Sequence, residues 1–374
     1  MSESPAERLR VLYDGWALVY EPNSPGALHL LTLLENLPAE VEPHLALPGE
    51  PPDWTPGAEQ GVTRHINPTP ADNRAHLAWE QRSLPQLSDQ LGARLLHLVS
   101  AAPLFGRTPT VLSPTGYSPE TPVPAASGLA GRLRLAMGAG GAARLRVRLW
   151  PEDLPDDQNK PPIRRLPALV NRVFTPPEGP GKTGPAPGLD QFQIPETYIL
   201  YHGPYDEGQL NRLLAAWRWA AGPIGDHYPL LILGLPEAAR QRLENLAAGL
   251  QLAETLLCLP VVPPAALGEL YRNCTALFHP APVSPWGEPL RAALACGKPI
   301  VALETPFSAA ITGPAAYLAP ESQSRALGAA LITTVIEESV AEALSAGAIQ
   351  RAAAWRSTAF PTELAQAYLQ AIGE

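Results

Sequence analysis

The chain has 374 residues, of which 45% are hydrophobic and 17% are charged. A chain of this length exceeds what one ordinary hydrophobic core occupies, so we expect two domains. Its net charge of -9 argues against nucleic acid or an anionic membrane face as the main partner.

The cysteines and the N-terminal residues indicate the compartment. Cys258, Cys274 and Cys296 fit no zinc spacing and lie among apolar or small residues, so we expect buried free thiols. The first ten residues contain no apolar core, which predicts no signal peptide, and no run approaches the roughly 18 apolar residues of a membrane span. We therefore expect a cytoplasmic protein without a transmembrane segment, and the sequence indicates no metal and no cofactor.

The N-terminal half alternates strand and helix patterns. Apolar runs predict strands at residues 10–18, 42–48, 93–100, 108–114 and 171–179. Helix patterns lie between them at 27–37 and 71–92, whereas residues 117–165 are less regular. Strands that alternate with helices predict a parallel sheet covered on both faces.

The second half repeats this pattern after a break. Residues 177–196 are too rich in proline and glycine to pack, so we expect a linker between an N-terminal domain of residues 1–176 and a C-terminal domain of residues 197–374. Strands are predicted at 197–205, 229–236, 255–262, 275–281, 300–304 and 315–320. The fold class is therefore α/β, with two doubly wound, Rossmann-like domains that face each other across a cleft.

Two short motifs imitate phosphate-binding loops. "GPGKTG" (179–184) has Pro176 where a P-loop needs its first glycine, and we interpret it as linker. "GAGGAA" (138–143) imitates a dinucleotide fingerprint but follows no apolar strand, and we interpret it as a glycine-rich kink or a flexible loop.

Longer segments carry a resemblance to a known family. "GPYDEGQLNRLLAAW" (203–217), "LYRNCTALFHPAPVSPWGEPLRAALACGKPIVALETP" (270–306) and, in the first half, "VLYDGWALVYEPNSPGALHLLTLL" (11–34) resemble GT-B glycosyltransferases, and more narrowly the retaining, nucleotide-sugar-dependent family 4. The resemblance covers nearly the whole chain in order. It implies the GT-B architecture and a last helix, at about 361–372, that crosses back onto the first domain.

The resemblance implies donor-site residues that this chain has lost. The family uses two glutamates spaced E-x7-E, and the matching positions are Ser284 and Ala292. Neither residue accepts hydrogen bonds from a sugar as a carboxylate does. Glu288 lies between them and is the one candidate acid, although we interpret it as capping the helix dipole.

The phosphate and sugar positions have changed in the same way. The family's cationic diphosphate clamp corresponds to Pro204 and Gln209, and Arg212 could form a displaced clamp. The family's His-Asp pair corresponds to Thr115-Gly116, and a further glutamate corresponds to Ala310. One glycine, Gly26, remains of the loop that approaches the phosphates, and we interpret His97 as a core histidine.

Three functional hypotheses stay open. The first is a non-catalytic GT-B protein that serves as a scaffold or as a partner of an active glycosyltransferase in glycan synthesis. The second is an active glycosyltransferase that takes a nucleotide-sugar at a rearranged site, with further candidate groups at Asp206 and Lys298. The third is a module that binds a non-sugar ligand in the cleft. If a donor binds, the candidate residues are Gly26, Gly203, Gln209, Arg212, Ser284, Trp286, Glu288 and Arg291.

Two surfaces are candidates for contacts with a partner. One is the pair Trp217 and Trp219, for which core packing is the alternative. The other is the arginine cluster of residues 132–148, for which an ordinary solvated helix is the alternative.

Overall fold

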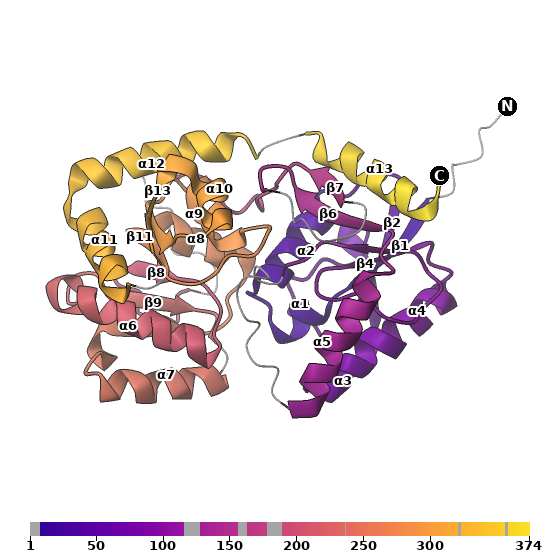
Figure 1. Cartoon of the computed structure of the whole chain (residues 1–374), viewed down its shortest axis with the longest axis horizontal. Helices are drawn as coiled ribbons and strands as arrows, with labels where there is room; N and C mark the ends of the chain where they lie inside the picture. The colour runs from indigo at the N-terminus through magenta and orange to yellow at the C-terminus, as the bar shows by residue number, and fades with distance from the viewer. Residues whose placement is uncertain are drawn as a thin grey trace. The chain divides into compact units, whose positions relative to one another are not determined.

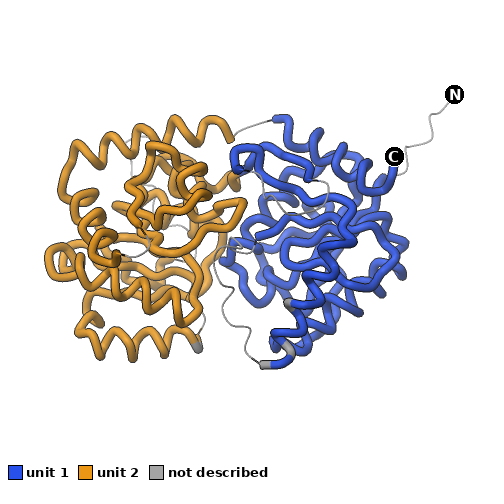
Figure 2. The backbone as a smooth tube through the Cα atoms, viewed as in Figure 1, with its two compact units in different colours: residues 1–169, 357–374 blue, residues 170–356 orange. Residues whose placement is uncertain are grey.

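The computed structural model describes residues 8–115, 128–155, 163–177, 189–235, 237–320, 323–355 and 358–374. The chain divides into two compact units (Figure 2). The first comprises residues 1–169 and 357–374, and the second comprises residues 170–356. Most of the expected linker, residues 178–188, lies outside the described residues together with the "GPGKTG" motif, so the extent of the linker stays a prediction.

The described residues of the first unit form a seven-stranded parallel sheet of order β3-β2-β1-β4-β5-β6-β7. The central strands are continuous apolar runs because helices cover both faces of such a sheet. The strands are β1 (Leu9–Asp14), β2 (Val41–Leu47), β3 (Thr63–Ile66), β4 (Leu95–Leu98), β5 (Thr110–Leu112), β6 (Val147–Pro151) and β7 (Ile163–Leu166).

Two helices of the first unit, α2 and α3, begin at residues whose side chains cap them. Ser24 accepts a hydrogen bond from the Ala27 amide, and Asp72 accepts from the amides of Arg74 and Ala75. The helices are α1 (Trp16–Tyr20), α2 (Pro25–Glu35), α3 (Asn73–Ala78), the π-helix η2 (Trp79–Ser83), α4 (Leu84–Leu91), α5 (Gly128–Ala142) and α13 (Phe360–Ile372), with a 3-10 turn η1 (Ala58–Gln60).

Three expectations for the N-terminal half of the chain were wrong. The first strand ends at Asp14, and the following residues form α1 because an Asp14 side-chain oxygen accepts from the Trp16 amide and turns the chain (3.1 Å). Residues 171–177 contain no strand, since Pro176 and Pro177 lack the N–H that a sheet ladder needs. The last strand is instead β7, within the segment that was expected to be irregular, which also contains α5 and β6.

The closing helix α13 lies on the first sheet, over β4 to β7 (Figure 1). The buried Tyr368 hydroxyl contacts Tyr13 Oη at 3.0 Å and His97 Nδ1 at 2.6 Å. His97 is fully buried, and its Nε2 contacts Ser113 Oγ at 2.8 Å. Because burial lowers the pKa of His97 to about 3, the ring is neutral, which confirms its interpretation as a core histidine.

The described residues of the second unit form a six-stranded parallel sheet of order β10-β9-β8-β11-β12-β13, so both units are doubly wound as expected. Its strands are β8 (Ile199–Tyr201), β9 (Leu230–Leu233), β10 (Leu256–Leu259), β11 (Ala276–His279), β12 (Ile300–Leu303) and β13 (Ala316–Ala319). Its helices are α6 (Glu207–Ile224), α7 (Glu237–Gly249), α8 (Pro264–Asn273), α9 (Glu288–Ala295), α10 (Pro306–Thr312), α11 (Ser324–Ile336) and α12 (Glu338–Ala353), with 3-10 turns η3 (Ala253–Thr255) and η4 (Gly313–Ala315).

The tryptophans and cysteines of this unit differ in burial. Trp217 is a core residue, whereas Trp219 is 50% exposed and lies beneath the Arg325 guanidinium, so core packing explains the first tryptophan alone. Cys274 and Cys296 are buried free thiols as expected, and Cys258 is a free thiol that is half-buried. Among the helices of the described residues, none has both the length and the apolar character needed to cross a bilayer.

The motif at residues 138–143 is neither a kink nor a loop, because its glycines lie at the end of α5. A Cβ atom on Gly141 would lie 2.1 Å from the carbonyl oxygen of Ala102. The glycine therefore lets the helix approach the segment that follows β4. Nearby, Arg144 donates hydrogen bonds to the carbonyls of Leu104 and Gly106, so this arginine stabilises a loop.

We expect Gly141→Ala to destabilise the protein by roughly 1–3 kcal/mol, because helix and loop must separate to admit the methyl group. Thermal unfolding measures the effect. The control is Gly249→Ala, also in a helix but facing open space, which should leave the unfolding midpoint unchanged or slightly higher. Equal unfolding midpoints for the two variants would contradict the close approach of α5 to the Ala102 carbonyl.

We also expect Tyr368→Phe to cost roughly 1–3 kcal/mol, because it leaves buried polar atoms of Tyr13 and His97 without a partner. Tyr317→Phe, at a tyrosine that is 43% exposed, is the matched control and should be neutral. Chemical denaturation compares the two, and a neutral Tyr368→Phe would show that the hydroxyl does not hold the closing helix.

Candidate functional site

Ligands of doubly wound sheets bind where the strand order reverses, beyond the carboxyl ends of the strands. In the second unit this point lies between β8 and β11, and in the first between β1 and β4. The sequence-predicted site residues are distributed over both points. Most of them lie in the second unit.

Side chains at the end of β8 and in the loop that follows it contact one another and neighbouring residues. The Tyr201 hydroxyl donates to the carbonyl of Pro204 (2.6 Å), and a Cβ atom on Gly203 would lie 2.8 Å from the Tyr201 ring. The buried His202 contacts the Tyr271 hydroxyl through Nδ1 (2.7 Å). Gly203 is thus required by the packing of Tyr201, and Pro204 offers no charge to a phosphate.

The start of α6 holds the other expected phosphate position. Asp206 is the N-cap of this helix and accepts a hydrogen bond from the Gln209 amide (3.1 Å). Arg212 is half-buried, one turn further along the helix. Among the described residues, the buried Gln209 Oε1 atom has no hydrogen-bond partner. This oxygen is an acceptor and so cannot replace a cation.

Four predicted residues do meet, at the start of α9. Ser284 Oγ donates to Glu288 Oε2 (2.6 Å) and accepts from the Gly287 amide (3.1 Å). The Trp286 carbonyl accepts from Arg291 Nε (2.7 Å), and the buried Arg291 guanidinium lies 4.6 Å from the centre of the Trp355 ring. These hydrogen bonds hold the loop of residues 284–287 against α9, and they use the side chains of both Ser284 and Arg291.

Glu288 lies in the first turn of α9, where a carboxylate interacts favourably with the helix dipole, as expected. Its Oε1 atom is buried, and this burial raises the pKa of the carboxyl group to about 7, although the Ser284 hydrogen bond opposes the shift. A carboxyl group in this condition carries only part of a negative charge at neutral pH.

The remaining family positions are structural. Ala292 is fully buried on α9, which packs on β11 and β12. The carbonyl of Ala310 accepts from Arg351 (2.5 Å). Lys298 is half-buried in the turn after α9.

In the first unit, Gly26 and Thr115 come together. A Cβ atom on Gly26 would lie 3.2 Å from Thr115 Oγ1, and that hydroxyl donates to the carbonyl of Val99 (2.6 Å). Both residues line a cavity of about 510 Å³ at the carboxyl ends of β1, β4 and β5. Gly116 lies outside the described residues.

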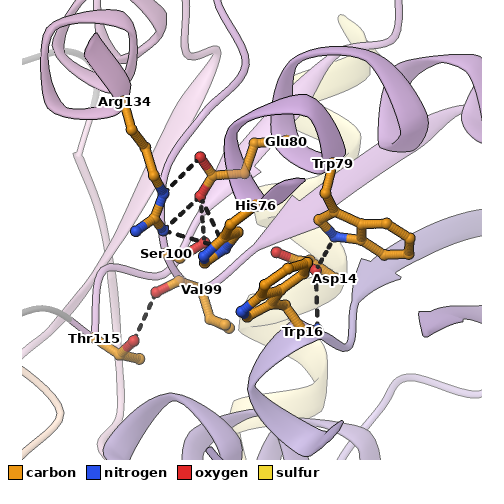
Figure 3. A network of polar contacts seen from close by, with 9 residues as sticks. All are labelled: Asp14, Trp16, His76, Trp79, Glu80, Val99, Ser100, Thr115 and Arg134. Atoms are coloured by element: carbon orange, nitrogen blue, oxygen red, sulfur yellow. Dashed lines mark hydrogen bonds and ion pairs between the residues drawn. The ribbon is translucent and has the colours of Figure 1, made fainter. Parts of the chain in front are cut away.

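This cavity borders a charged network that the sequence analysis missed (Figure 3). The Arg134 guanidinium forms two hydrogen bonds with the buried Glu80 carboxylate, at 2.9 and 2.7 Å. Arg134 also donates to His76 Nε2 (3.2 Å). Asp14 Oδ1 accepts from the Trp79 indole N–H (2.9 Å). One signal was present in the sequence, since Asp14 is an acid at the end of an apolar strand.

Burial governs the charges of this network. It raises the pKa of both Asp14 and Glu80, while Trp79 and Arg134 respectively stabilise the ionised forms. Burial also lowers the pKa of His76 to about 3, so its ring is neutral and accepts the Arg134 hydrogen bond. Arg134 is therefore not a residue of an ordinary solvated helix, which corrects that interpretation of the arginine cluster. Arg148 is also not part of a solvated helix, because it lies in β6 and is buried over the Trp150 ring.

The pKa of Glu288 predicts a pH effect. In the folded protein the Glu288 carboxyl group loses its proton only near pH 7, whereas in the unfolded chain it loses its proton near pH 4.5. The folded state therefore binds more protons between these values, and the stability of the protein falls as the pH rises through this range. We expect Glu288→Gln to match the parent at acidic pH and to exceed it at pH 8 by on the order of 1–3 kcal/mol. Unfolding midpoints at both pH values measure this, with the exposed Glu254→Gln as control. A pH-independent difference would rule out the titration of Glu288.

Comparisons with known proteins agree on the fold. Residues 196–351 match the family model described as glycosyl transferases group 1. The sucrose-phosphate synthase of Thermosynechococcus elongatus is similar in structure, with 15% identity, a TM-score of 0.68, and coverage of 97% of this chain and 99% of that one. HepE of Anabaena, solved with UDP and glucose, has 13% identity, a TM-score of 0.69, and coverage of 96% and 99%.

WaaG, a glycosyltransferase involved in lipopolysaccharide biosynthesis, is similar at 14% identity and a TM-score of 0.69, with coverage of 95% of this chain and 98% of that one. None of the curated proteins matches this chain in sequence. At these identities the structural likeness establishes the fold, and the match to the family model lies within the second unit. The chain therefore has the GT-B fold, and its residues 196–351 match the model of the glycosyl transferases group 1 family.

Proposed function

We propose that this chain is a glycosyltransferase-like protein that does not catalyse sugar transfer and instead acts as a scaffold or partner subunit in glycan synthesis. The observation that carries the proposal is the pair Ser284 and Ala292, at the positions of the family's two donor carboxylates. Ala292 has no polar side-chain atom, and Ser284 is engaged with Glu288.

The cations near these positions support the same proposal. A donor diphosphate concentrates negative charge that positive side chains must balance. Arg291 is buried and bonds the Trp286 carbonyl, while Arg351 bonds the carbonyls of Ile311 and Ala310. The expected clamp positions hold the neutral residues Pro204 and Gln209. Loss of one such contact typically costs about 10²–10³ in rate, so losing the set predicts negligible transfer.

One observation favours the alternative, an active glycosyltransferase with a rearranged nucleotide-sugar site. Glu288 has its pKa raised to about 7, and a carboxyl group that titrates near neutral pH is suited to act as a general acid or base. In that case Glu288 would act on the sugar, with Arg212 and Lys298 as the cations for the phosphates.

A panel of nucleotide-sugars separates the two proposals. We expect UDP-, GDP- and ADP-sugars to leave the unfolding midpoint of the full chain unchanged and to remain unhydrolysed. A ligand present at about 100 times its dissociation constant would stabilise the protein by roughly 2.7 kcal/mol, which is readily measured. If any donor stabilises the protein or is hydrolysed by it, and Glu288→Gln abolishes that effect, the proposal is overturned in favour of the alternative. Co-purification with an active glycosyltransferase would support the partner role.

A further inference from the structure

We propose that the first unit binds a small phosphate monoester with an apolar or aromatic ester group, in a second cavity at the amino ends of β5 and β6. This inference goes beyond the proposed function, because it requires neither a nucleotide-sugar nor a transfer reaction. It rests on residues of the first unit alone. The cavity has a volume of about 400 Å³, which lies within the roughly 300–1,000 Å³ range of small-molecule sites.

This cavity lies at the other end of the strands from the one that contains Gly26 and Thr115. Residues 108–110 lie at the start of β5, and Arg146 directly precedes β6. The buried Ala102 and Leu145 line both cavities, so the two share part of a wall. Ligands of doubly wound sheets bind beyond the carboxyl ends of the strands, and the second cavity is therefore not at that position.

Positive charge is concentrated in the second cavity, although the whole protein has a net charge of -9. Arg107, Arg144 and Arg146 are exposed and line it. Among the described residues, no acidic side chain belongs to its lining. Like charges around one space repel one another, and an anion bound between them replaces this repulsion by attraction. The lining therefore favours a ligand that carries more than one negative charge.

Arg144 keeps its charge for such a ligand although it already forms hydrogen bonds. Its guanidinium donates to the carbonyls of Leu104 and Gly106. Carbonyl oxygens are neutral, so these bonds orient the guanidinium without pairing its charge. A guanidinium has five N–H donors in a planar fork that matches the oxygens of a phosphate group.

The loop that forms one wall of the cavity is fixed from the side of η2 and α4. The amide of Leu104 donates to Gln81 Oε1 (2.7 Å), and Thr108 Oγ1 contacts Ser88 Oγ at 2.8 Å. Because both ends of the loop are held before any ligand arrives, binding would cost little conformational entropy.

Phe105 lies in this loop and suggests the nature of the ester group. Its side chain is 60% exposed and lines the cavity together with the arginines. An apolar or aromatic group on the ligand would cover this ring and remove apolar surface from water.

A phosphate monoester matches the charge of the lining better than other anions of similar size. It carries nearly two negative charges at neutral pH, on oxygens that a guanidinium fork can bond. A carboxylate carries one charge. Each phosphate of a nucleotide-sugar is bonded to two groups and also carries one, so such a donor fits this cavity less well.

Isothermal titration calorimetry on the full chain tests the site, with phenyl phosphate, inorganic phosphate and benzoate as probes at constant ionic strength. We expect saturable binding of phenyl phosphate. Inorganic phosphate lacks the ring and benzoate lacks the second charge, so each should bind at least about fivefold more weakly. Arg107→Gln and Arg146→Gln should each weaken the binding of phenyl phosphate about five- to tenfold.

Two further variants complete the test. Phe105→Ala should lower the affinity for phenyl phosphate to that for inorganic phosphate and leave the latter unchanged. Arg218→Gln, the same chemical change at an exposed arginine of the second unit, is the matched control and should bind like the parent. Unfolding midpoints of all variants exclude loss of binding by misfolding.

The inference would be overturned if phenyl phosphate shows no saturable binding, or if neither Arg107→Gln nor Arg146→Gln weakens it. Equal affinities for phenyl phosphate and inorganic phosphate would contradict the role of the ester group. Equal affinities for phenyl phosphate and benzoate would contradict the preference for a phosphate.

Discussion

Everything at the two candidate sites depends on one pairing in each sheet, β1 with β4 in the first unit and β8 with β11 in the second. At these pairs the strand order reverses, so the chain leaves adjacent strands in opposite directions and the loops separate. Backbone and side-chain polar groups at the strand ends can then meet in space that no crossover helix fills. The hydrogen-bonded register brings the ends of β1 and β4 together, and this fixes Asp14 beside Ser100.

The two units use this common geometry differently. In the second unit the groups at the strand ends bond one another, as Tyr201 does with Pro204 and His202 with Tyr271. In the first unit, by contrast, the groups at the strand ends surround a cavity and are held by a charged network from α3, η2 and α5. A fold can therefore keep its packing at a ligand position while the chemistry of that position changes, because packing and chemistry depend on different atoms.

Glu288 and Glu80 illustrate how surroundings decide what a carboxyl group does. Burial raises the pKa of both. The Arg134 guanidinium donates to both oxygens of Glu80, which favours the ionised form, whereas Glu288 Oε2 accepts from the neutral Ser284 hydroxyl. Glu80 is thus suited to hold Arg134 in place, and Glu288 is the residue whose charge responds to pH near neutrality.

The sequence by itself determined the alternation of strands and helices and the two doubly wound units. These are properties of local apolar runs and of proline and glycine breaks, which act within a few residues. It also identified His97 as a core residue, because an apolar strand surrounds it. The likeness of the family segments carried the assignment of the fold.

Only the tertiary structure decided the rest. The strand β7 depends on its neighbour β6, and the close approach of Gly141 to the Ala102 carbonyl depends on how α5 packs; neither partner is visible in the local pattern. The network of the first unit joins Asp14 to Trp79 and Glu80 to Arg134 across 65 and 54 positions of the chain. Polar groups so far apart meet because parallel strands bring their carboxyl ends to one edge, and this register is set by the packed sheet as a whole.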